Sequence, residues 1–256
     1  MSFYVGAYTD IGTTRATNQD SLCVIQAKTS YGDACMAIVC DGMGGLEKGE
    51  LASTSVIKSF ERWFEEDFPV VLKEQYSEAE ILDLWKKRLF HLNDKMQEYG
   101  MKNRILLGTT FSGILFFKNK YLWMHVGDSR IYQIDRKAVQ LTSDHTVAAR
   151  EVRNGTMTEE EAKHSKLKSK LTQCVGASEV LEPEIGSGTF DEKSCFLICS
   201  DGFHHKFELE NMKELSSDKY ANEKKLNQFC QNAVKSVMKM GEKDNISVIV
   251  VKHSRG

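Results

Sequence analysis

The stretch that most constrains this chain is Ala37-Ile38-Val39-Cys40-Asp41-Gly42-Met43-Gly44-Gly45. A short apolar run with β-branched residues predicts a buried strand. The strand delivers the carboxylate of Asp41 and then meets three glycines within four positions. Glycine tolerates positive φ and lets a ligand approach the main chain closely. The pattern therefore predicts an open, tightly turned acidic site at the end of a sheet.

Two phosphate-binding loops can be excluded here by spacing. A P-loop starting at Gly44 needs Lys after its second glycine, and the residue after Gly49 is Glu50. A dinucleotide fingerprint starting at Gly42 needs a third glycine where the chain has Glu47. An ordinary strand-to-helix turn explains this stretch equally well when it is considered by itself.

The same pattern recurs, and the recurrence favours a metal site. Aspartates in small-residue settings border apolar strands at Asp41-Gly42, Asp128-Ser129, Asp201-Gly202 and Asp244-Asn245, with Asp20 as a fifth. One strand-end aspartate is usually a solvated turn or a helix cap. Several that converge repel one another and require a compensating positive charge. Oxygen ligands alone suit a hard cation, Mg²⁺ or Mn²⁺.

The remaining patterns predict an α+β chain, because strands and pairs of long helices do not alternate regularly. Helical apolar spacing covers residues 56–64 and 77–96, the latter opened by a capping box from Ser77 to Glu80. A last helix should bury one face made of Leu226, Phe229, Cys230, Ala233, Val237 and Met240. Strands are expected at residues 3–9, 21–27, 34–40, 111–117, 121–126, 131–134, 195–199 and 246–251.

Composition excludes several classes of protein. The 256 residues carry 34 basic and 36 acidic side chains, which argues against a nucleic-acid-binding surface. The sequence has no linker, signal-peptide pattern or apolar segment of membrane-spanning length, so we expect a single cytoplasmic domain without a membrane span. Seven cysteines lie mostly in apolar runs and form no Cys-x-x-Cys pair, which indicates buried thiols in a reducing compartment.

Eight motifs occur in an order that resembles one known family. They are Arg15-x-x-Asn18-Gln19-Asp20, Asp41-Gly42-Met43-Gly44-Gly45, Gly108-Thr109-Thr110, Gly127-Asp128-Ser129-Arg130, Leu141-Thr142-x-Asp144-His145-Thr146, Leu171-Thr172-x-x-x-Gly176, Cys199-Ser200-Asp201-Gly202 and Asp244-Asn245-Ile246-Ser247-Val248. The set is similar to that of the metal-dependent protein phosphatases (PPM, type 2C Ser/Thr protein phosphatases), the compact bacterial branch in particular. The match runs from about residue 5 to residue 251.

The resemblance implies an αββα sandwich of two mainly antiparallel β-sheets flanked by helix pairs, in one domain spanning residues 1–256. It also implies a flap subdomain at about residues 143–170. Two Mn²⁺ or Mg²⁺ ions would occupy the core site. Asp41 would bridge them, Asp201 and Asp244 would complete the first, and the Gly42 carbonyl and the Asp20 region would serve the second.

Further roles follow from the same resemblance. Asp128 would hold a third ion together with Asp201. Arg15 would bind the substrate phosphate through a bidentate contact that lysine makes poorly. Two departures stand out. Met43 occupies the position of a histidine proposed as general acid in animal members, and Gln19 stands where some members have a glutamate.

Other candidate side chains are assigned structural roles. His125 lies in an apolar strand and is interpreted as a core histidine. His204 and His205 follow the Asp201 turn and could approach the cleft, but a surface or capping role is favoured. Asp144-His145 is expected to fix the start of the flap. None of the seven cysteines has the arginine six positions later that a cysteine-dependent phosphatase needs.

The resemblance implies a monomeric protein phosphatase that hydrolyses phosphoserine and phosphothreonine by direct attack of a metal-bridging hydroxide. Its partners would be phosphorylated proteins, namely a Ser/Thr kinase and the targets of that kinase. Two alternatives of the same fold remain: a pseudophosphatase that acts as a binding module, and a partner-switch regulatory module. The presence of every expected metal-binding aspartate disfavours the first, and the absence of a fused sensor domain disfavours the second.

Overall fold

The structure, a computed structural model, describes residues 3–43, 48–135, 137–191 and 193–253. Gly44 and Gly45, the last glycines of the acidic turn, lie outside the described residues. Ten strands form two antiparallel five-stranded sheets in this part of the chain, with the orders β1-β10-β9-β6-β7 and β2-β3-β4-β5-β8. The predicted α+β class is confirmed.

The strands are β1 (Phe3–Asp10), β2 (Asp20–Thr29), β3 (Gly32–Asp41), β4 (Phe111–Phe117), β5 (Lys120–Val126), β6 (Arg130–Ile134), β7 (Ala138–Gln140), β8 (Glu184–Thr189), β9 (Cys195–Cys199) and β10 (Ile246–His253). The helices are α1 (Gly49–Arg62), α2 (Phe68–Lys73), α3 (Glu78–Asn103), α4 (Val147–Arg153), α5 (Glu159–His164), α6 (Asp201–His204) and α7 (Glu223–Lys239). Three short helical segments complete the set, the π-helical η1 (Trp63–Asp67) and the 3-10 helices η2 (Leu209–Ser216) and η3 (Asp218–Tyr220).

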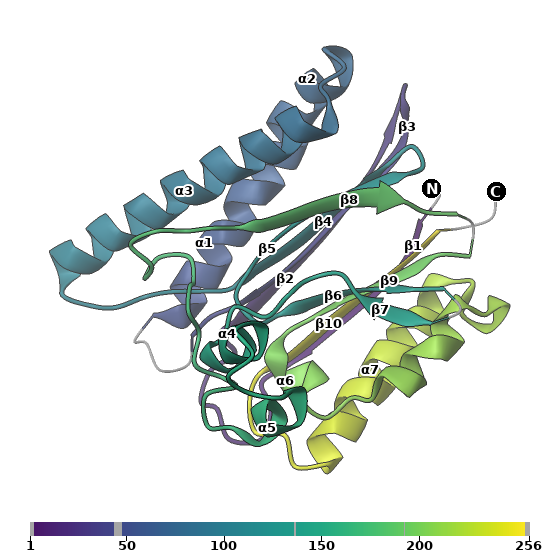
Figure 1. Cartoon of the computed structure of the whole chain (residues 1–256). Coiled ribbons are helices and arrows are strands. Elements are labelled where there is room, and N and C mark those ends of the chain that lie inside the picture. The colour runs from purple at the N-terminus through teal and green to yellow at the C-terminus, as the bar shows by residue number, and fades with distance from the viewer. Residues whose placement is uncertain (1–2, 44–47, 136, 192, 254–256) are drawn as a thin grey trace.

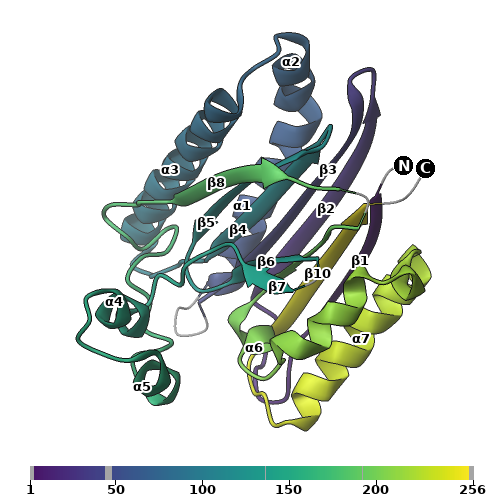
Figure 2. The ribbon, with the colours of Figure 1, turned by 45° about the vertical axis from the view of Figure 1, so that its right-hand side comes forward.

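The two sheets pack face to face and the long helices cover their outer faces (Figures 1 and 2). Alternate residues of the strands point inward and meet at the centre of the sandwich, as the two-residue period of a strand requires. That central layer includes Ala37 and Val39 from β3, Ile198 from β9 and Ile249 from β10. The αββα arrangement expected from the resemblance is therefore present.

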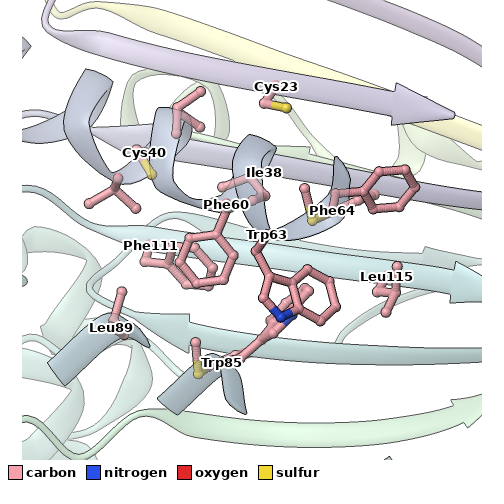
Figure 3. Packing of buried hydrophobic residues seen from close by; sticks show 14 of the residues in the cluster. Cys23, Ile38, Cys40, Phe60, Trp63, Phe64, Trp85, Leu89, Phe111 and Leu115 are labelled. Atoms are coloured by element: carbon pink, nitrogen blue, oxygen red, sulfur yellow. The ribbon is translucent and has the colours of Figure 1, made fainter. Parts of the chain in front are cut away.

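A second apolar layer lies between the β2-β3-β4-β5-β8 sheet and helices α1 and α3. The rings of Phe60 and Trp63 pack edge-on against the indole of Trp85, with ring centroids 5.3 and 5.5 Å apart (Figure 3). Ser77 caps α3 through the predicted capping box with Glu80. Both long helical patterns are confirmed, and their aromatic residues belong to the core.

Helix α7 covers the other sheet with five buried residues, Leu226, Cys230, Ala233, Val234 and Val237. Phe229 also packs against this cluster. The prediction that Met240 shares this face is wrong, since its side chain is 52% exposed. The helix ends at Lys239 and the chain turns away at Gly241, where φ is +84°. Helical periodicity no longer applies to a residue beyond the end of a helix.

Strand β8 was not predicted from the sequence. Its Gly186 and Gly188 lie opposite Trp123 and Tyr121 of β5. A Cβ atom on either glycine would come within 2.5 Å of the facing ring. The glycines make room for these rings across the pair, which stabilises a strand of low intrinsic propensity. The stability of such a strand depends on contacts with the neighbouring strand, so its own sequence shows no apolar pattern from which it could be predicted.

The loops that carry the expected site residues meet at one end of the sandwich, near α6 and the α4–α5 excursion, while both termini lie at the opposite end (Figure 1). Antiparallel pairing brings these sequence-distant strand ends together. Asp20 at the start of β2 is the register partner of Asp41 at the end of β3. Among the described residues, no helix is long and apolar enough to cross a membrane.

Candidate active site

The end of β3 is fixed by the Gly108-Thr109-Thr110 segment. The backbone N–H of Asp41 donates to the hydroxyl of Thr110 at 2.9 Å, and its carbonyl accepts from the Thr110 N–H at 2.9 Å. The hydroxyl of Thr109 donates to the same carbonyl at 2.9 Å. These bonds hold the Asp41 backbone in one position, which is how this motif supports the acidic turn.

Gly42 is required where it stands. A Cβ atom on this residue would lie 2.4 Å from the Gly49 carbonyl oxygen and 2.5 Å from that of Gln19. The Gly42 N–H donates to the Gln19 carbonyl at 3.1 Å, which ties the turn to the start of β2. The packing therefore leaves no room for a side chain beside the carboxylate of Asp41.

A cavity of about 560 Å³ opens at this end of the sandwich. Five predicted site residues line it: Arg15, Asp41, Asp128, Asp201 and Asp244. Its other lining residues come from the turn after β3, from β4 and its approach, and from the segment after α5: Met43, Thr110, Ser169, Lys170, Leu171, Thr172, Gln173, Cys174, Ala177 and Ser178. Strands distant in sequence thus place four carboxylates and one guanidinium around one space.

Asp20 lies behind the cavity wall and does not line it. Its side chain is buried, and its Oδ2 accepts a hydrogen bond of 2.9 Å from the Ser200 hydroxyl. The same hydroxyl oxygen accepts from the Ser247 N–H at 3.0 Å. Ser200 thereby links Asp20 to the strand ends that present Asp201. The sequence showed that Ser200 lies inside a family motif, but it did not show that Ser200 connects Asp20 to Asp201.

The residues after Asp201 combine the two roles considered for them. His205 is the C-cap residue of α6, in agreement with the favoured capping role, and both His204 and His205 also contact residues of the acidic site, which was the less favoured alternative. The ring Nε2 of His204 donates to the Asp128 carbonyl at 2.9 Å, and the ring of His205 lies 3.9 Å from the Asp201 carboxylate. The short helix α6 places these rings beside Asp128 and Asp201, which the adjacent positions of the two histidines do not reveal.

Arg15 is held at the cavity by two loops that bind each other. Asn245 accepts from the Gln19 N–H at 2.9 Å and donates to the carbonyls of Ile11 and Thr17 at 2.8 and 3.1 Å. The Arg15 guanidinium forms a two-bond contact with Asp244, with N–O distances of 2.7 and 2.6 Å. Asn245 is another residue whose positioning role was missed, although its motif was recognised.

The carboxylates perturb one another strongly. Burial, followed by the charges of Asp20, Asp201 and Asp128, raises the pKa of Asp41 well above its usual value. Burial and the charge of Asp201 do the same to the pKa of Asp128. Burial also raises the pKa of Asp20 to about 7, against the effect of its serine hydrogen bonds. Like charges in a poorly solvated site resist ionisation, and a bound cation would reverse that effect.

The donor set fits divalent cations. The Oδ1 atom of Asp20 is buried and has no hydrogen-bond partner among the described residues. An unpartnered buried carboxylate oxygen is costly unless a cation or a proton satisfies it. The cavity also presents carboxylates from four separate segments of the chain, and such oxygen ligands suit Mg²⁺ and Mn²⁺.

A second cluster of metal-ligand residue types, His125, His145 and Glu184, is already hydrogen-bonded. His125 pairs with the Ser112 hydroxyl at 2.8 Å and the Gly127 carbonyl at 2.9 Å. The carboxylate oxygens of Glu184 accept from the backbone N–H and the hydroxyl of Ser143, at 2.7 and 3.0 Å. These bonds make the cluster structural and confirm His125 as a core histidine.

His145 and Asp144 fix the base of the α4–α5 excursion, as predicted. The His145 backbone N–H donates to the Gly127 carbonyl at 2.7 Å, and its carbonyl accepts from the Thr172 N–H at 2.8 Å. Arg130 holds Asp144 through two hydrogen bonds of 2.8 and 2.7 Å. The two ends of the excursion are therefore anchored to β6 and its preceding turn.

The cysteines offer no nucleophile for phosphate chemistry. All seven are free and buried. Burial raises the pKa of the Cys174 thiol, the one cysteine that lines the cavity among the described residues. A thiol held in its neutral form is a poor nucleophile. The interpretation of the cysteines as buried apolar residues is confirmed.

The family model described as protein phosphatase 2C matches residues 13–247. The chain belongs to the protein phosphatase 2C family. The family match spans the whole acidic end of the sandwich, from the Arg15 loop to the start of β10. The chain is thus a protein phosphatase with a metal-binding type of active site.

Curated relatives cover nearly the full chain. Protein phosphatase PhpP of Streptococcus pneumoniae is 27% identical over 252 residues, which is 96% of this chain and 96% of that protein. A serine/threonine phosphatase stp of Listeria welshimeri is 26% identical over 250 residues, 96% of this chain and 94% of that protein.

Solved structures agree with this assignment. A serine/threonine phosphatase of S. agalactiae superposes with a TM-score of 0.84 at 29% identity and covers 98% of this chain and 100% of that one. The catalytic domain of the serine/threonine protein phosphatase PstP, in complex with two manganese ions, superposes with a TM-score of 0.78 at 25% identity, covering 99% of each chain.

Proposed function

We propose that this protein phosphatase hydrolyses phosphoserine and phosphothreonine esters of proteins at the cavity lined by Arg15 and Asp41, using two divalent cations. The observation that carries the proposal is the convergence of Asp41, Asp128, Asp201 and Asp244 on that cavity, together with Arg15. Relatives named as serine/threonine phosphatases support the substrate class.

The residues have distinct proposed roles. Asp41 would contribute to both cation sites, Asp201 and Asp244 would complete one, and the Gly42 carbonyl and Asp20 would serve the other. Asp128 and Asp201 line the same cavity, and the charge of Asp201 raises the pKa of Asp128, so these two would hold a third cation. Bound divalent cations would supply an activated water as the nucleophile and neutralise the phosphoryl oxygens.

Arg15 would bind the phosphoryl group. Its planar guanidinium presents two parallel N–H donors to a tetrahedral anion, which orients the ester relative to the carboxylate wall. Met43 lines the cavity where animal members of the family have a histidine. A thioether has no ionisable proton. We infer that a water, and not this side chain, protonates the leaving alcohol.

The pseudophosphatase and partner-switch alternatives lack a supporting observation. A binding module would not need to keep four mutually repelling carboxylates around an open cavity, because that arrangement is unfavourable without cations. We propose phosphorylated proteins as the substrates, and a Ser/Thr kinase and its targets as the partners. We further propose that the excursion at residues 143–170, which contains α4 and α5, acts as a flap beside the cavity.

The decisive experiment measures release of phosphate from a phosphothreonine peptide. Chelation with EDTA should abolish turnover, and Mn²⁺ or Mg²⁺ should restore it. Added cation should also raise the melting temperature, because it binds only the folded state. At a cation concentration one hundred times Kd, the free energy of unfolding should increase by about 2.7 kcal/mol. Full turnover by protein shown to be metal-free would contradict the proposal.

A further inference from the structure

Asp244 has both carboxylate oxygens engaged by the residue proposed to bind phosphate. The Nε of Arg15 donates to Oδ1 at 2.7 Å and the Nη2 to Oδ2 at 2.6 Å. The Asn245 N–H also donates to Oδ1 at 2.8 Å. This is the two-bond geometry that guanidinium groups form with carboxylates. Oδ1 thus accepts two hydrogen bonds and Oδ2 accepts one. A cation that coordinates Asp244 on the side that faces Arg15 must replace at least one guanidinium bond, and at any position on this carboxylate its charge repels the guanidinium.

The loop that carries Arg15 is held in place by hydrogen bonds that do not involve the Arg15 side chain. The hydroxyls of Thr13 and Thr14 donate to the carbonyls of Glu242 and Lys243 at 2.9 and 2.7 Å. Asn245 adds two further bonds to the same loop. The guanidinium can therefore leave Asp244 by side-chain rotation while the backbone stays docked.

The charge balance of the cavity also depends on Arg15. Its pKa is raised by the hydrogen bond and charge of Asp244, with smaller effects from Asp41 and Asp201. The guanidinium is thus a counter-charge for the same carboxylates that are proposed to bind cations. A divalent cation at these carboxylates supplies more positive charge and leaves the guanidinium available to another anion.

We propose that Asp244 exchanges partners: a divalent cation and Arg15 compete for its carboxylate, so that cation binding releases Arg15 to hold the substrate phosphate. Phosphate that engages Arg15 in turn frees Asp244 and strengthens cation binding. The coupling must be equal in both directions, since it is a property of one thermodynamic cycle. This inference rests on the roles proposed above for Arg15 and Asp244.

Calorimetric titration of Mn²⁺ into metal-free protein, without phosphate, tests the competition. The Arg15→Ala variant should bind Mn²⁺ about three- to tenfold more tightly than wild type, since the lost pair is partly exposed and of moderate strength. If Arg15 served only to bind phosphate, its replacement by Ala would leave the Mn²⁺ affinity unchanged. Arg15→Lys, which keeps the charge but lacks the planar fork, should fall between the two.

Lys170→Ala is the matched control for charge, because Lys170 lines the same cavity. It should change Mn²⁺ affinity less than Arg15→Ala does. Melting curves of the metal-free variants establish that each is folded. The inference is overturned if Arg15→Ala binds Mn²⁺ no more tightly than wild type, or if Lys170→Ala tightens binding by the same factor.

A second titration measures the coupling itself. Inorganic phosphate should tighten Mn²⁺ binding to wild type by a larger factor than to Arg15→Ala, because the variant retains only direct contact between the two ligands. Equal factors would refute the exchange. Neither titration uses catalysis. Failure of the proposed function would appear as absent turnover, whereas failure of this inference would appear as unchanged affinity in an active enzyme.

Discussion

The aromatic core beneath α1 and α3 and the acidic end of the sandwich are both buried, but burial has opposite consequences in them. In the core, Phe60, Trp63 and Trp85 fill space with rings whose carbon surface gains from leaving water, and this gain outweighs two indole N–H groups, of Trp63 and Trp85, that have no hydrogen-bond partner among the described residues. At the acidic end, burial raises the pKa values of Asp20 and Asp41 and leaves one carboxylate oxygen unpartnered. Burial in the core stabilises the fold. Burial of the carboxylates is unfavourable, and the stability of the rest of the fold offsets it.

The strongest test of this contrast is Asp41→Asn. Loss of the bridging charge should lower kcat by about a thousandfold or more. The same change should raise the stability of the metal-free protein by about 2 kcal/mol, roughly 4–8 °C in Tm, because it removes a repelling buried charge. Phosphopeptide kinetics and a melting curve in EDTA measure the two effects. Near-normal turnover would refute the assignment of Asp41 as a metal ligand. A lower Tm would refute the claim that repulsion between the carboxylates destabilises the metal-free protein.

Trp85→Ala should show the opposite pattern. The indole is fully buried against Phe60 and Trp63, so its loss should cost about 3–5 kcal/mol of unfolding free energy. Turnover per folded molecule should stay close to wild type, because Trp85 is not among the residues that line the cavity. Phe90→Ala, on the same helix but 39% exposed, is the matched control and should cost less than about 0.5 kcal/mol. Equal losses in both variants would contradict the core assignment.

Two buried titratable groups near the acidic end should respond oppositely to acid. Burial lowers the pKa of His145 to about 4, below its unfolded value near 6.5. Between these values the unfolded chain binds more protons, so stability falls as the pH drops through this window. The raised pKa of Asp20 has the reverse sign, because there the folded state takes up the proton and gains stability as pH falls below about 7.

Comparison of His145→Asn with wild type separates the two effects. Relative to wild type, the variant should gain about 1 kcal/mol of unfolding free energy on going from pH 7.5 to pH 5.5, since it lacks the histidine that resists protonation. Urea denaturation at the two pH values gives this difference. The same relative stability at both pH values would show that His145 titrates normally in the folded protein.

The smallest expected effect concerns the lysines of the excursion. Lys163, Lys166 and Lys168 lie in or after α5 and are exposed. Changing all three to Gln should raise KM for acidic phosphopeptides about two- to fivefold and make KM less dependent on salt. Exposed charges act mainly by speeding the encounter with a charged partner, and salt screens this attraction. Hydrolysis of p-nitrophenyl phosphate should not change. Equal KM values for the variant and wild type would leave these lysines as a solvated surface.

Periodicity and motif order were sufficient for much of the fold. The helical patterns around Phe60 and Trp85, the capping box at Ser77 and the strand ending in Asp41 are local properties, set by side chains a few residues apart. Order along the chain also identified Arg15 and the five aspartates as one motif set. These features were readable because each depends on neighbours in sequence.

Contacts between distant segments were decided by the tertiary structure alone. The chain order does not show that Asp20 lies behind the cavity on Ser200, that His204 turns toward Asp128, or that Arg15 grips Asp244. Strand β8 likewise exists because the rings of β5 cover its glycines. Each of these depends on which strands become neighbours in a sheet. That choice is made by the burial of both sheet faces at once, which no short stretch of sequence encodes.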